Sequence, residues 1–481
     1  MKILTGTRLL VLSGLLSLTL ISGCGSSTSK NSASTSENVF YSYGVFQDQN
    51  NDLWAAGYNG YGQLANGSLA NIAAFAPISD PLVKDTLLHA AGYSSGANHV
   101  LAFDNTTVWA WGSNFSGRLG IAGLATSGSK AYSFIPLQVP TISNVGKVVG
   151  VAAGWKHSLA AIVVSGVGKV YGWGDNTYGQ VGYGFPVTQW DLPINVSVPG
   201  DVVEVAAGGG HSLARTSDGK VYGWGYNFYG QAGQLNIANN NAIYATPYPV
   251  PLPTTVGGTP RVATQIAAAG SYSLAVLRDP TTDEGTIWGW GYGLYGQLGL
   301  GVNSLGAPIA VTAQVVQDDL NKFYPVKKSD GTTLVFQNLS SASIRQKVAP
   351  GQLHVLALVL GSDGKGHVYS WGDNEKGQLG ISTDPNRTKP DGSPDPGEAQ
   401  VTFWNESAQE ATILKGLIAS STQGVTDVYA IGNTSYAKIN NHWYGWGDNN
   451  WGQLGRTIPT NTVSYILKPI SLLLDPSTGP L

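Results

Sequence analysis

The sequence of 481 residues has one cysteine, one methionine and few charged residues. Because Cys24 is the single cysteine, no internal disulfide can form, and an exported form of the chain depends on packing for its stability. Charged residues make up 11% of the chain, against about 25% in an average globular protein. The 26 basic and 29 acidic residues give a net charge of −3, which lacks the basic excess that nucleic-acid binding requires. We therefore expect no nucleic-acid partner.

Glycine and aromatic residues are abundant instead. The chain contains 64 glycines, 14 tryptophans and 23 tyrosines. A chain that is rich in glycine and aromatic residues and poor in helix-forming residues is typical of many short strands joined by tight turns. The composition therefore predicts an all-β protein.

The first 23 residues have the pattern of a secretion signal. Lys2 and Arg8 precede the apolar run Leu9–Leu20, which is shorter than the roughly 20 residues of a transmembrane helix. The run ends in Ile21-Ser-Gly-Cys24, which resembles the lipobox of bacterial lipoproteins, and this resemblance implies that Cys24 is acylated and anchors the chain to a membrane. By resemblance to enterobacterial sorting, Gly25 after the cysteine favours the outer membrane. The Ser- and Thr-rich residues 24–38 cannot build a core and are expected to form a flexible tether.

A repeated phrase dominates the remaining sequence. It is clearest in Val170-Tyr-Gly-Trp-Gly174 and the turn that follows, where side chains alternate with the period of a strand before Asn and Gly residues suited to a turn. The phrase occurs seven times, with its strand glycine at Gly57, Gly112, Gly174, Gly225, Gly291, Gly372 and Gly447. Repeats at a regular period of this size indicate a repeat architecture in which each unit packs on the next.

A second phrase, Ala-Ala-Gly-x-x-His-Ser-Leu-Ala, precedes most copies of the first. Its histidine position is occupied by His99, His157, His211 and His354, with Tyr272, Tyr436 and Tyr41 in the other copies. Since histidine alternates with tyrosine, we interpret the position as a structural hydrogen-bonding site and expect no metal there. The last copy of the first phrase is followed by no second phrase, which predicts that Val39–Phe46 completes the last sheet and closes a ring without long open edges.

Together the two phrases resemble the repeat of the regulator of chromosome condensation family, and this resemblance implies a seven-bladed β-propeller. We expect the propeller over residues 39–474, followed by a tail at 475–481. The spacing of the repeats widens at Ser304–Ser343 and Thr383–Gly424, and these insertions are expected to form surface loops. The best-known activity of the family is nucleotide exchange on a nuclear GTPase, which a lipid-anchored exported protein would not meet, so we expect no such partner.

No sequence motif marks a catalytic centre or a cofactor site. The chain lacks G-x-S-x-G, H-E-x-x-H, the phosphate-binding loop and C-x-x-C-H. Asp175, Asp373 and Asp448 follow the strand glycine, where capping of the turn explains them better than acid–base chemistry. We therefore expect no cofactor and no metal, and we predict a non-enzymatic module of the cell envelope that binds or scaffolds an unknown protein or glycan. The alternatives are an enzyme acting on polysaccharide, with catalytic residues in the insertions, and a purely structural part of an envelope assembly.

One turn position offers a candidate binding face. The residue before the second glycine of each turn is Tyr61, Ser116, Tyr178, Tyr229, Tyr295, Lys376 or Trp451, and Phe115 and Phe228 lie one residue earlier in their turns. Tyrosine and tryptophan are favoured interface anchors because they combine apolar area with a polar tip. The alternative, which the sequence leaves open, is that these rings pack on the next blade.

Overall fold

The computed structural model describes residues 43–48, 50–79, 88–185, 187–234, 243–256, 258–300, 324–339, 344–381, 404–455 and 465–472. All of them belong to one structural unit, Tyr41–Leu481. The signal segment, Cys24, the tether, residues 39–42 and the tail lie outside the described residues, as do large parts of the two insertions.

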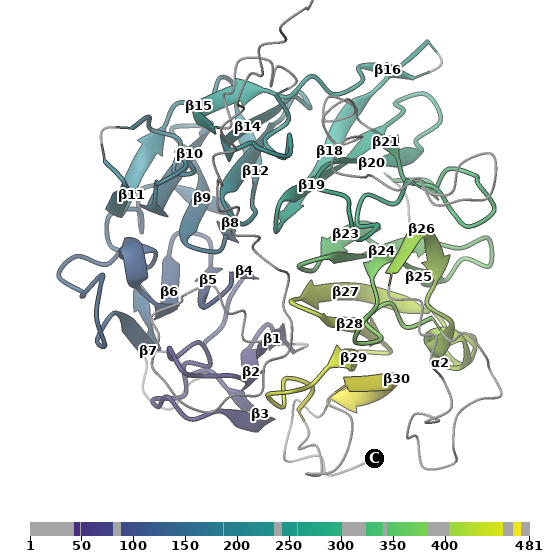
Figure 1. Cartoon of the computed structure of the whole chain (residues 1–481), viewed down its shortest axis with the longest axis horizontal. Helices are drawn as coiled ribbons and strands as arrows, with labels where there is room; N and C mark the ends of the chain where they lie inside the picture. Colours follow the sequence, from purple (N-terminus) through teal and green to yellow (C-terminus); the bar gives the residue numbers. More distant parts are fainter. Residues whose placement is uncertain are drawn as a thin grey trace, which may run out of the picture. The chain divides into compact units, whose positions relative to one another are not determined.

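Apart from one two-stranded hairpin, the described strands form seven antiparallel sheets, one for each repeat, which we number as blades 1 to 7. Figure 1 shows them following one another around a ring in chain order. Blade 1 contains β1 (Tyr43–Gln47), β2 (Leu53–Gly57) and β3 (Ile72–Pro77). Blade 2 contains β4 (Gly92–Ser95), β5 (His99–Phe103), β6 (Val108–Ser113) and β7 (Tyr132–Gln138). Blade 3 contains β8 (Lys147–Ala153), β9 (His157–Val164), β10 (Val167–Asp175) and β11 (Gln189–Val196).

The later blades repeat this order. Blade 4 contains β12 (Val202–Ala207), β13 (His211–Thr216), β14 (Val221–Tyr226) and β15 (Ile243–Pro249). Blade 5 contains β18 (Val262–Ala269), β19 (Tyr272–Arg278), β20 (Gly285–Gly291), β21 (Tyr324–Pro325) and β22 (Val335–Phe336). Blade 6 contains β23 (Lys347–Pro350), β24 (His354–Leu360), β25 (Gly366–Asp373) and β26 (Trp404–Glu410). Blade 7 contains β27 (Val425–Ile431), β28 (Thr434–Ile439), β29 (His442–Asp448) and β30 (Tyr465–Leu472). The prediction of an all-β, seven-bladed propeller is confirmed.

The remaining elements lie between blades. A hairpin of β16 (Thr255–Val256) and β17 (Thr259–Pro260) connects blades 4 and 5. The 3-10 helix η3 (Thr412–Leu414) and the helix α2 (Lys415–Ser420) precede blade 7, and η1 (Phe115–Gly117) forms the turn of blade 2. No helix among the described residues is long and apolar enough to cross a membrane.

The strand glycine of each repeat is required by backbone geometry. Gly174 is the penultimate residue of β10, the third strand of its blade, and has φ 101°, a conformation that other residues rarely adopt. It lies opposite His157, and a Cβ atom at Gly174 would lie 2.6 Å from the backbone oxygen of Lys156. The glycine therefore allows the third strand to turn sharply beside the second.

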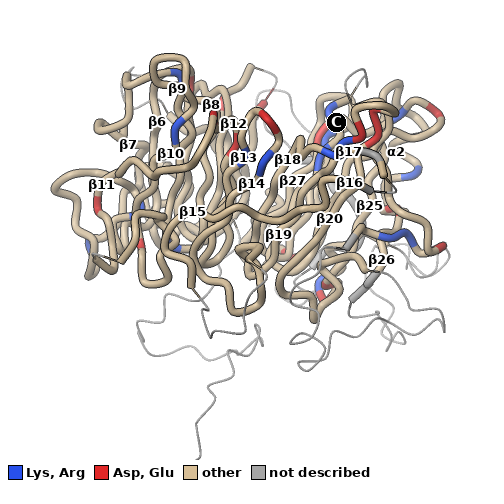
Figure 2. The backbone as a smooth tube through the Cα atoms, turned by 90° about the horizontal axis from the view of Figure 1, so that it is seen from above, with Lys and Arg blue, Asp and Glu red and all other residues tan. Residues whose placement is uncertain are grey.

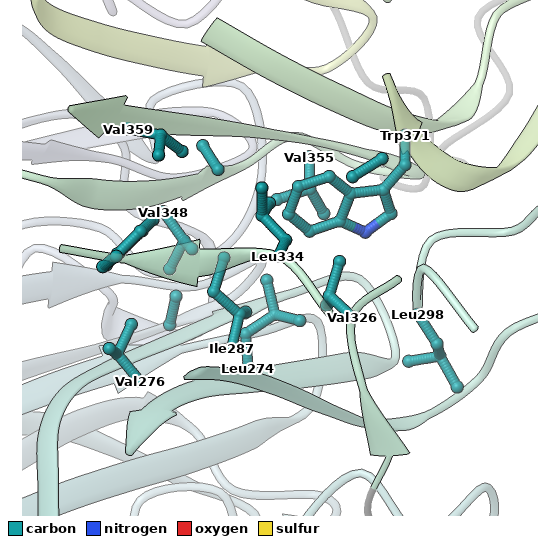
Figure 3. Close-up of a cluster of buried hydrophobic side chains, with 14 of the residues drawn as sticks. Leu274, Val276, Ile287, Leu298, Val326, Leu334, Val348, Val355, Val359 and Trp371 are labelled. Atoms are coloured by element: carbon teal, nitrogen blue, oxygen red, sulfur yellow. The ribbon is translucent and has the colours of Figure 1, made fainter. Parts of the chain in front are cut away.

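The hydrophobic core lies between the blades, with one cluster at each of the seven junctions. Figure 3 shows the cluster between blades 5 and 6, where Trp371 packs over Val355, Val326 and Leu334. The Trp side chain at this repeat position also donates from Nε1 to a backbone oxygen of the preceding blade, as Trp224 does to Gln180 at 2.9 Å. The same bond recurs from Trp111, Trp173, Trp290, Trp371 and Trp446. Blades 2 to 7 are thus each joined to the preceding blade by both apolar contact and a buried hydrogen bond.

The strand pairing at ring closure differs from the prediction. β1 pairs with β2 of its own blade, with Tyr43 opposite Gly57, and blade 7 is built from four strands between residues 425 and 472. The prediction that Val39–Phe46 completes the last blade is therefore wrong for its described residues. The register explains why: Tyr43 faces Gly57 as His157 faces Gly174, so β1 is the second strand of a regular blade.

Side chains, not strand pairing, join the described parts of blades 7 and 1. The Phe46 ring lies 4.6 Å from the Tyr436 ring and 5.1 Å from the Trp443 ring, and Trp443 Nε1 donates to the backbone oxygen of Gln47 at 3.2 Å. These residues belong to one buried cluster that spans both blades. The N-terminal and C-terminal blades therefore meet through an aromatic core.

The side chain that donates to the backbone oxygen at this junction differs from those at the other junctions. At four other junctions a Trp and a Ser both donate to one backbone oxygen of the preceding blade, as Trp224 and Ser212 do to Gln180. Blade 1 has Ala56 and Gly44 at those two positions. Tyr436 Oη donates to the backbone oxygen of Gln453 instead, at 3.1 Å. A Cβ atom at Gly44 would lie 2.8 Å from the Phe46 ring and 3.2 Å from Tyr436 Oη, so a serine would not fit beside the rings that fill this junction.

Candidate functional site

The turns that follow the strand glycines lie together at one end of the propeller, which we call the turn face. Their backbones are fixed from within. In blade 3, Asn176 Oδ1 accepts from the backbone N–H of Val181 at 3.2 Å, and Gln180 Oε1 accepts from that of Tyr178 at 2.8 Å. Both side chains are buried. The Tyr178 side chain is therefore presented from a rigid turn.

The predicted face residues occupy equivalent positions in these turns. Each precedes a glycine with positive φ, and the N–H of that glycine donates to the residue three positions earlier, as Gly179 does to Asn176 at 2.9 Å. Phe228, Tyr178 and Trp451 are exposed, with 55%, 41% and 37% of their surface accessible. The partly buried members are Tyr61, Phe115, Ser116, Tyr229, Tyr295 and Lys376. The structure thus places all of these side chains on the turn face and none fully inside it.

The aromatic residues also pack on the next blade. Tyr178 lies 4.8 Å from Tyr226 of blade 4, and Tyr229 lies 4.8 Å from Tyr292 of blade 5, measured between ring centroids. Trp451 of blade 7 meets Tyr58 of blade 1 at 5.1 Å. The same inter-blade pair therefore occurs at three junctions, and in each case one ring supports the other. Packing and exposure are combined at this position, and the two interpretations of the sequence do not exclude each other.

The supporting residues Tyr58, Tyr226 and Tyr292 were missed as site residues. They directly follow the strand glycine, a position that we interpreted as turn capping because aspartate occupies it in other blades. In the sequence, each of these three tyrosines occurs in a blade whose predecessor has an aromatic residue before the second glycine of its turn. This co-occurrence would have identified them.

Two of the supporting tyrosines, Tyr226 and Tyr292, remain protonated at neutral pH. Partial burial, together with the neighbouring tyrosines, raises the pKa of Tyr226 and of Tyr292 to about 12. In blade 6 the turn is charged instead, with Asp373, Glu375 and Lys376. Burial raises the pKa of Asp373 to about 6 although Gln378 Nε2 donates to its carboxylate at 2.8 Å. The turns of blades 4 and 5 are therefore aromatic and uncharged, whereas the turns of blades 3, 6 and 7 each contain at least one aspartate.

The repeated histidines form a structural ring that lies beneath the turns. His157 Nε2 lies 2.9 Å from Ser212 Oγ of the next blade, and Ser212 Oγ donates to the backbone oxygen of Gln180 at 2.7 Å. The same contact joins His99 to Ser158, His211 to Ser273 and His354 to Ser435. Burial lowers the pKa of His157 to about 4 and those of His211 and His354 to about 3. These side chains are neutral hydrogen-bonding residues, as the sequence predicted.

Tyrosine takes over where the next blade lacks the serine. Tyr272 Oη donates to the backbone oxygens of Gly351 and His354, both at 2.9 Å, and Val355 follows His354 where serine stands elsewhere. Tyr43 makes the equivalent bonds to Gly96 and His99, beside Val100.

Two assignments to this position were wrong. Thr434, and not Tyr436, lies opposite the strand glycine Gly447, and Tyr43 fills the position in blade 1, whereas Tyr41 lies outside the described residues. In both repeats the register of the strands moves the position by two residues relative to the sequence-based alignment. Among the described residues no group of three or more His, Cys, Asp or Glu side chains is arranged to hold a metal ion.

These features define the class of protein: a seven-bladed propeller of tandem repeats with a rigid, partly aromatic turn face. A family model described as the regulator of chromosome condensation (RCC1) repeat matches residues 106–161, 167–215, 218–276 and 365–402. A second model of the same repeat matches residues 148–180 and 202–231. The chain therefore carries RCC1 repeats, and the resemblance inferred from its two phrases is confirmed.

Relatives and solved structures agree with this assignment. The chain is 30% identical to the ultraviolet-B receptor UVR8 of Arabidopsis thaliana over 211 residues, 43% of this chain and 42% of the receptor. It is 26% identical to the human E3 ubiquitin-protein ligase HERC2 over 339 residues, 69% of this chain and 6% of the ligase. The matches thus span less than half the length of both relatives.

Two crystal structures, each 20% identical in sequence, share the fold. Human WBSCR16 superposes with a TM-score of 0.60 over 87% of this chain and 94% of its own. Prp20p of Saccharomyces cerevisiae, whose binding to Gsp1p and histones has been described, superposes with a TM-score of 0.61 over 89% of this chain and 86% of its own. RCC1-like propellers are typical of protein-binding or regulatory modules.

Proposed function

We propose that the protein is a lipid-anchored, non-enzymatic binding module of the bacterial cell envelope that recognises a protein or glycan partner with its turn face. The observation that carries the proposal is the set of inter-blade aromatic pairs, which are held by a rigid ring and yet leave Tyr178 and Trp451 more than one third exposed. Rigid aromatic side chains with one free face are effective anchors because little conformational entropy is lost when they are covered.

The distribution of charge supports the choice of this end. The ion pairs of blades 4 and 5 lie on the strands and loops away from the turn face, as in Arg215–Glu204 at 2.7 Å and Arg278–Asp283 at 2.6 Å. Figure 2 shows Lys, Arg, Asp and Glu residues gathered around β17 and α2, whereas the segments around β14, β15 and β19 carry few of them. An exposed aromatic surface without charged residues, as in the turns of blades 4 and 5, favours association with another molecule.

The anchoring part of the proposal depends on the N-terminal sequence alone. Cys24 follows the apolar run and is the single cysteine of the chain, and acylation there would attach the propeller to a membrane through the tether. The proposed site is the outer membrane.

Alanine substitution tests the face. Tyr178→Ala, Tyr229→Ala, Tyr295→Ala and Trp451→Ala are expressed singly, and partners are captured from intact envelopes and identified by mass spectrometry. Loss of an anchor is expected to weaken capture by about 2 kcal/mol, while loss of the ring pair lowers stability by only about 1 kcal/mol. Val167→Ala, which removes an exposed side chain at the other end of blade 3, is the control. Undiminished capture by all four variants would contradict the proposal.

A further inference from the structure

Two adjacent turns on the turn face expose apolar side chains at their tips. Phe228 of blade 4 and Leu294 of blade 5 are 55% and 49% accessible, and both directly precede the tyrosine before the second glycine. Tyr229 and Tyr292 of the same two turns have ring centroids 4.8 Å apart, and the Phe228 and Tyr226 rings lie nearly parallel at 6.3 Å. We call this surface the tip patch; it consists of Tyr226, Phe228, Tyr229, Tyr292 and Leu294.

The tip patch offers rings and hydroxyls but no charges. The two turns, residues 225–233 and 291–299, contain no Lys, Arg, Asp or Glu. Their polar side chains point inward: Asn227 Oδ1 accepts from the N–H of Ala232 at 2.8 Å, and Gln231 Oε1 accepts from that of Tyr229 at 2.9 Å, and both are fully buried. The polar atoms left at the surface by the patch side chains are tyrosine hydroxyls, which make no hydrogen bond to another described residue.

The patch also cannot pair with a strand. Backbone N–H groups in the turn of blade 4 are used internally, from Gly230 to Asn227 at 2.9 Å and from Gly233 to Gly230 at 2.8 Å. A partner must therefore present apolar rings and hydrogen-bond acceptors, and it must have few hydrogen-bond donors of its own.

We propose, on the basis of the proposed function, that the tip patch binds an uncharged proline-rich segment of a partner protein in the polyproline II conformation. Proline has no backbone N–H to satisfy, and its carbonyl oxygens can accept from the tyrosine hydroxyls. The polyproline II helix is extended and preorganised, so binding to an aromatic-lined surface costs little ordering entropy. The ring centroids are 4.8 Å apart in both inter-blade tyrosine pairs, Tyr178–Tyr226 and Tyr229–Tyr292. The two pairs provide neighbouring aromatic surfaces on which proline rings can pack.

A glycan fits this surface less well. Sugar hydroxyls are donors as well as acceptors, and a specific site needs convergent polar groups to orient them. The carboxylate and amide side chains that would serve this purpose are absent from the two turns or turned inward.

The test uses the full chain and a polyproline peptide of about ten residues, titrated by calorimetry. A Gly/Ser peptide of equal length and a neutral oligosaccharide serve as comparison ligands. Saturable binding of the polyproline peptide alone is expected, with affinity reduced about tenfold or more by Phe228→Ala and by Leu294→Ala. Glu375→Ala, which changes the exposed tip residue of blade 6, is the matched control and is expected to bind as the wild type does. Because the side chains removed are about half exposed, each variant should melt close to the wild type.

The outcomes separate this inference from the proposed function. Binding of the oligosaccharide, lost in Phe228→Ala, would overturn the inference in favour of a glycan. Absence of polyproline binding, with envelope capture still lost in Phe228→Ala, would overturn the inference and leave the binding module intact. If neither polyproline binding nor capture depends on Phe228 or Leu294, the tip patch is not a binding surface.

Discussion

Exchanging one histidine–serine pair for the tyrosine–valine pair found in other blades tests the logic of the inter-blade ring. At the junction of blades 3 and 4, Ser212 Oγ donates its proton to the backbone oxygen of Gln180 at 2.7 Å. His157 must therefore carry its proton on Nε2 and donate to Ser212 Oγ, 2.9 Å away. Ser212→Val removes the acceptor and leaves a buried N–H unsatisfied, which costs about 1–3 kcal/mol. His157→Tyr alone enlarges a fully buried side chain and costs about 1–3 kcal/mol.

The double variant His157→Tyr/Ser212→Val should recover much of this loss. In the natural chain, Tyr43 beside Val100 and Tyr272 beside Val355 donate to two carbonyl oxygens of the next blade at 2.9 Å. The new hydroxyl would find the equivalent oxygens of Gly208 and His211. Urea unfolding of the four proteins gives the coupling energy, which we expect to be favourable by about 1–3 kcal/mol. Additive losses, within about 0.5 kcal/mol, would refute the reasoning, because the pairs would then be independent of each other.

Three further predictions follow from the same structure. The buried histidines have folded-state pKa values below the ordinary 6.5. The unfolded chain therefore binds more protons below that pH, and stability should fall as pH decreases from about 6.5 toward 4. In His211→Gln the slope of unfolding free energy against pH should be smaller by about 1.4 kcal/mol per pH unit, and an unchanged slope would contradict the burial of a neutral His211. Tyr436→Phe leaves the Gln453 backbone oxygen without its donor and should lower stability by about 1–3 kcal/mol. The control Tyr444→Phe, on a partly buried ring of the same blade, should have a small effect. Equal melting of the two variants would show that the bond from Tyr436 does not contribute to ring closure. Cys24→Ser should move the protein from the membrane fraction to the soluble fraction, because the acyl chains that would give stable anchoring are then missing; persistent membrane association would disprove the lipoprotein assignment.

The sequence by itself determined the number of blades, the all-β class and the position of the turn-face residues. These are local properties: in all seven repeats a glycine with positive φ lies at or next to the end of the strand before the turn, and in most repeats an asparagine and a glutamine fix the turn that follows. A residue such as Tyr178 can therefore be placed at one end of the ring from its distance to Gly174 and Gly179 alone, without knowledge of its neighbours.

Only the tertiary structure decided which residues meet across the junctions. Tyr272 bonds to the backbone of His354, 82 residues further along the chain, and the reason for tyrosine in place of histidine lies in the valine of that distant blade. The degraded repeats show the same limit: Thr434 holds the histidine position because strand register sets it there, while Tyr436, two residues later, takes over the bonds of a missing Trp and Ser at ring closure. Contacts between blades depend on side chains brought together by packing, and the spacing within one repeat carries no record of them.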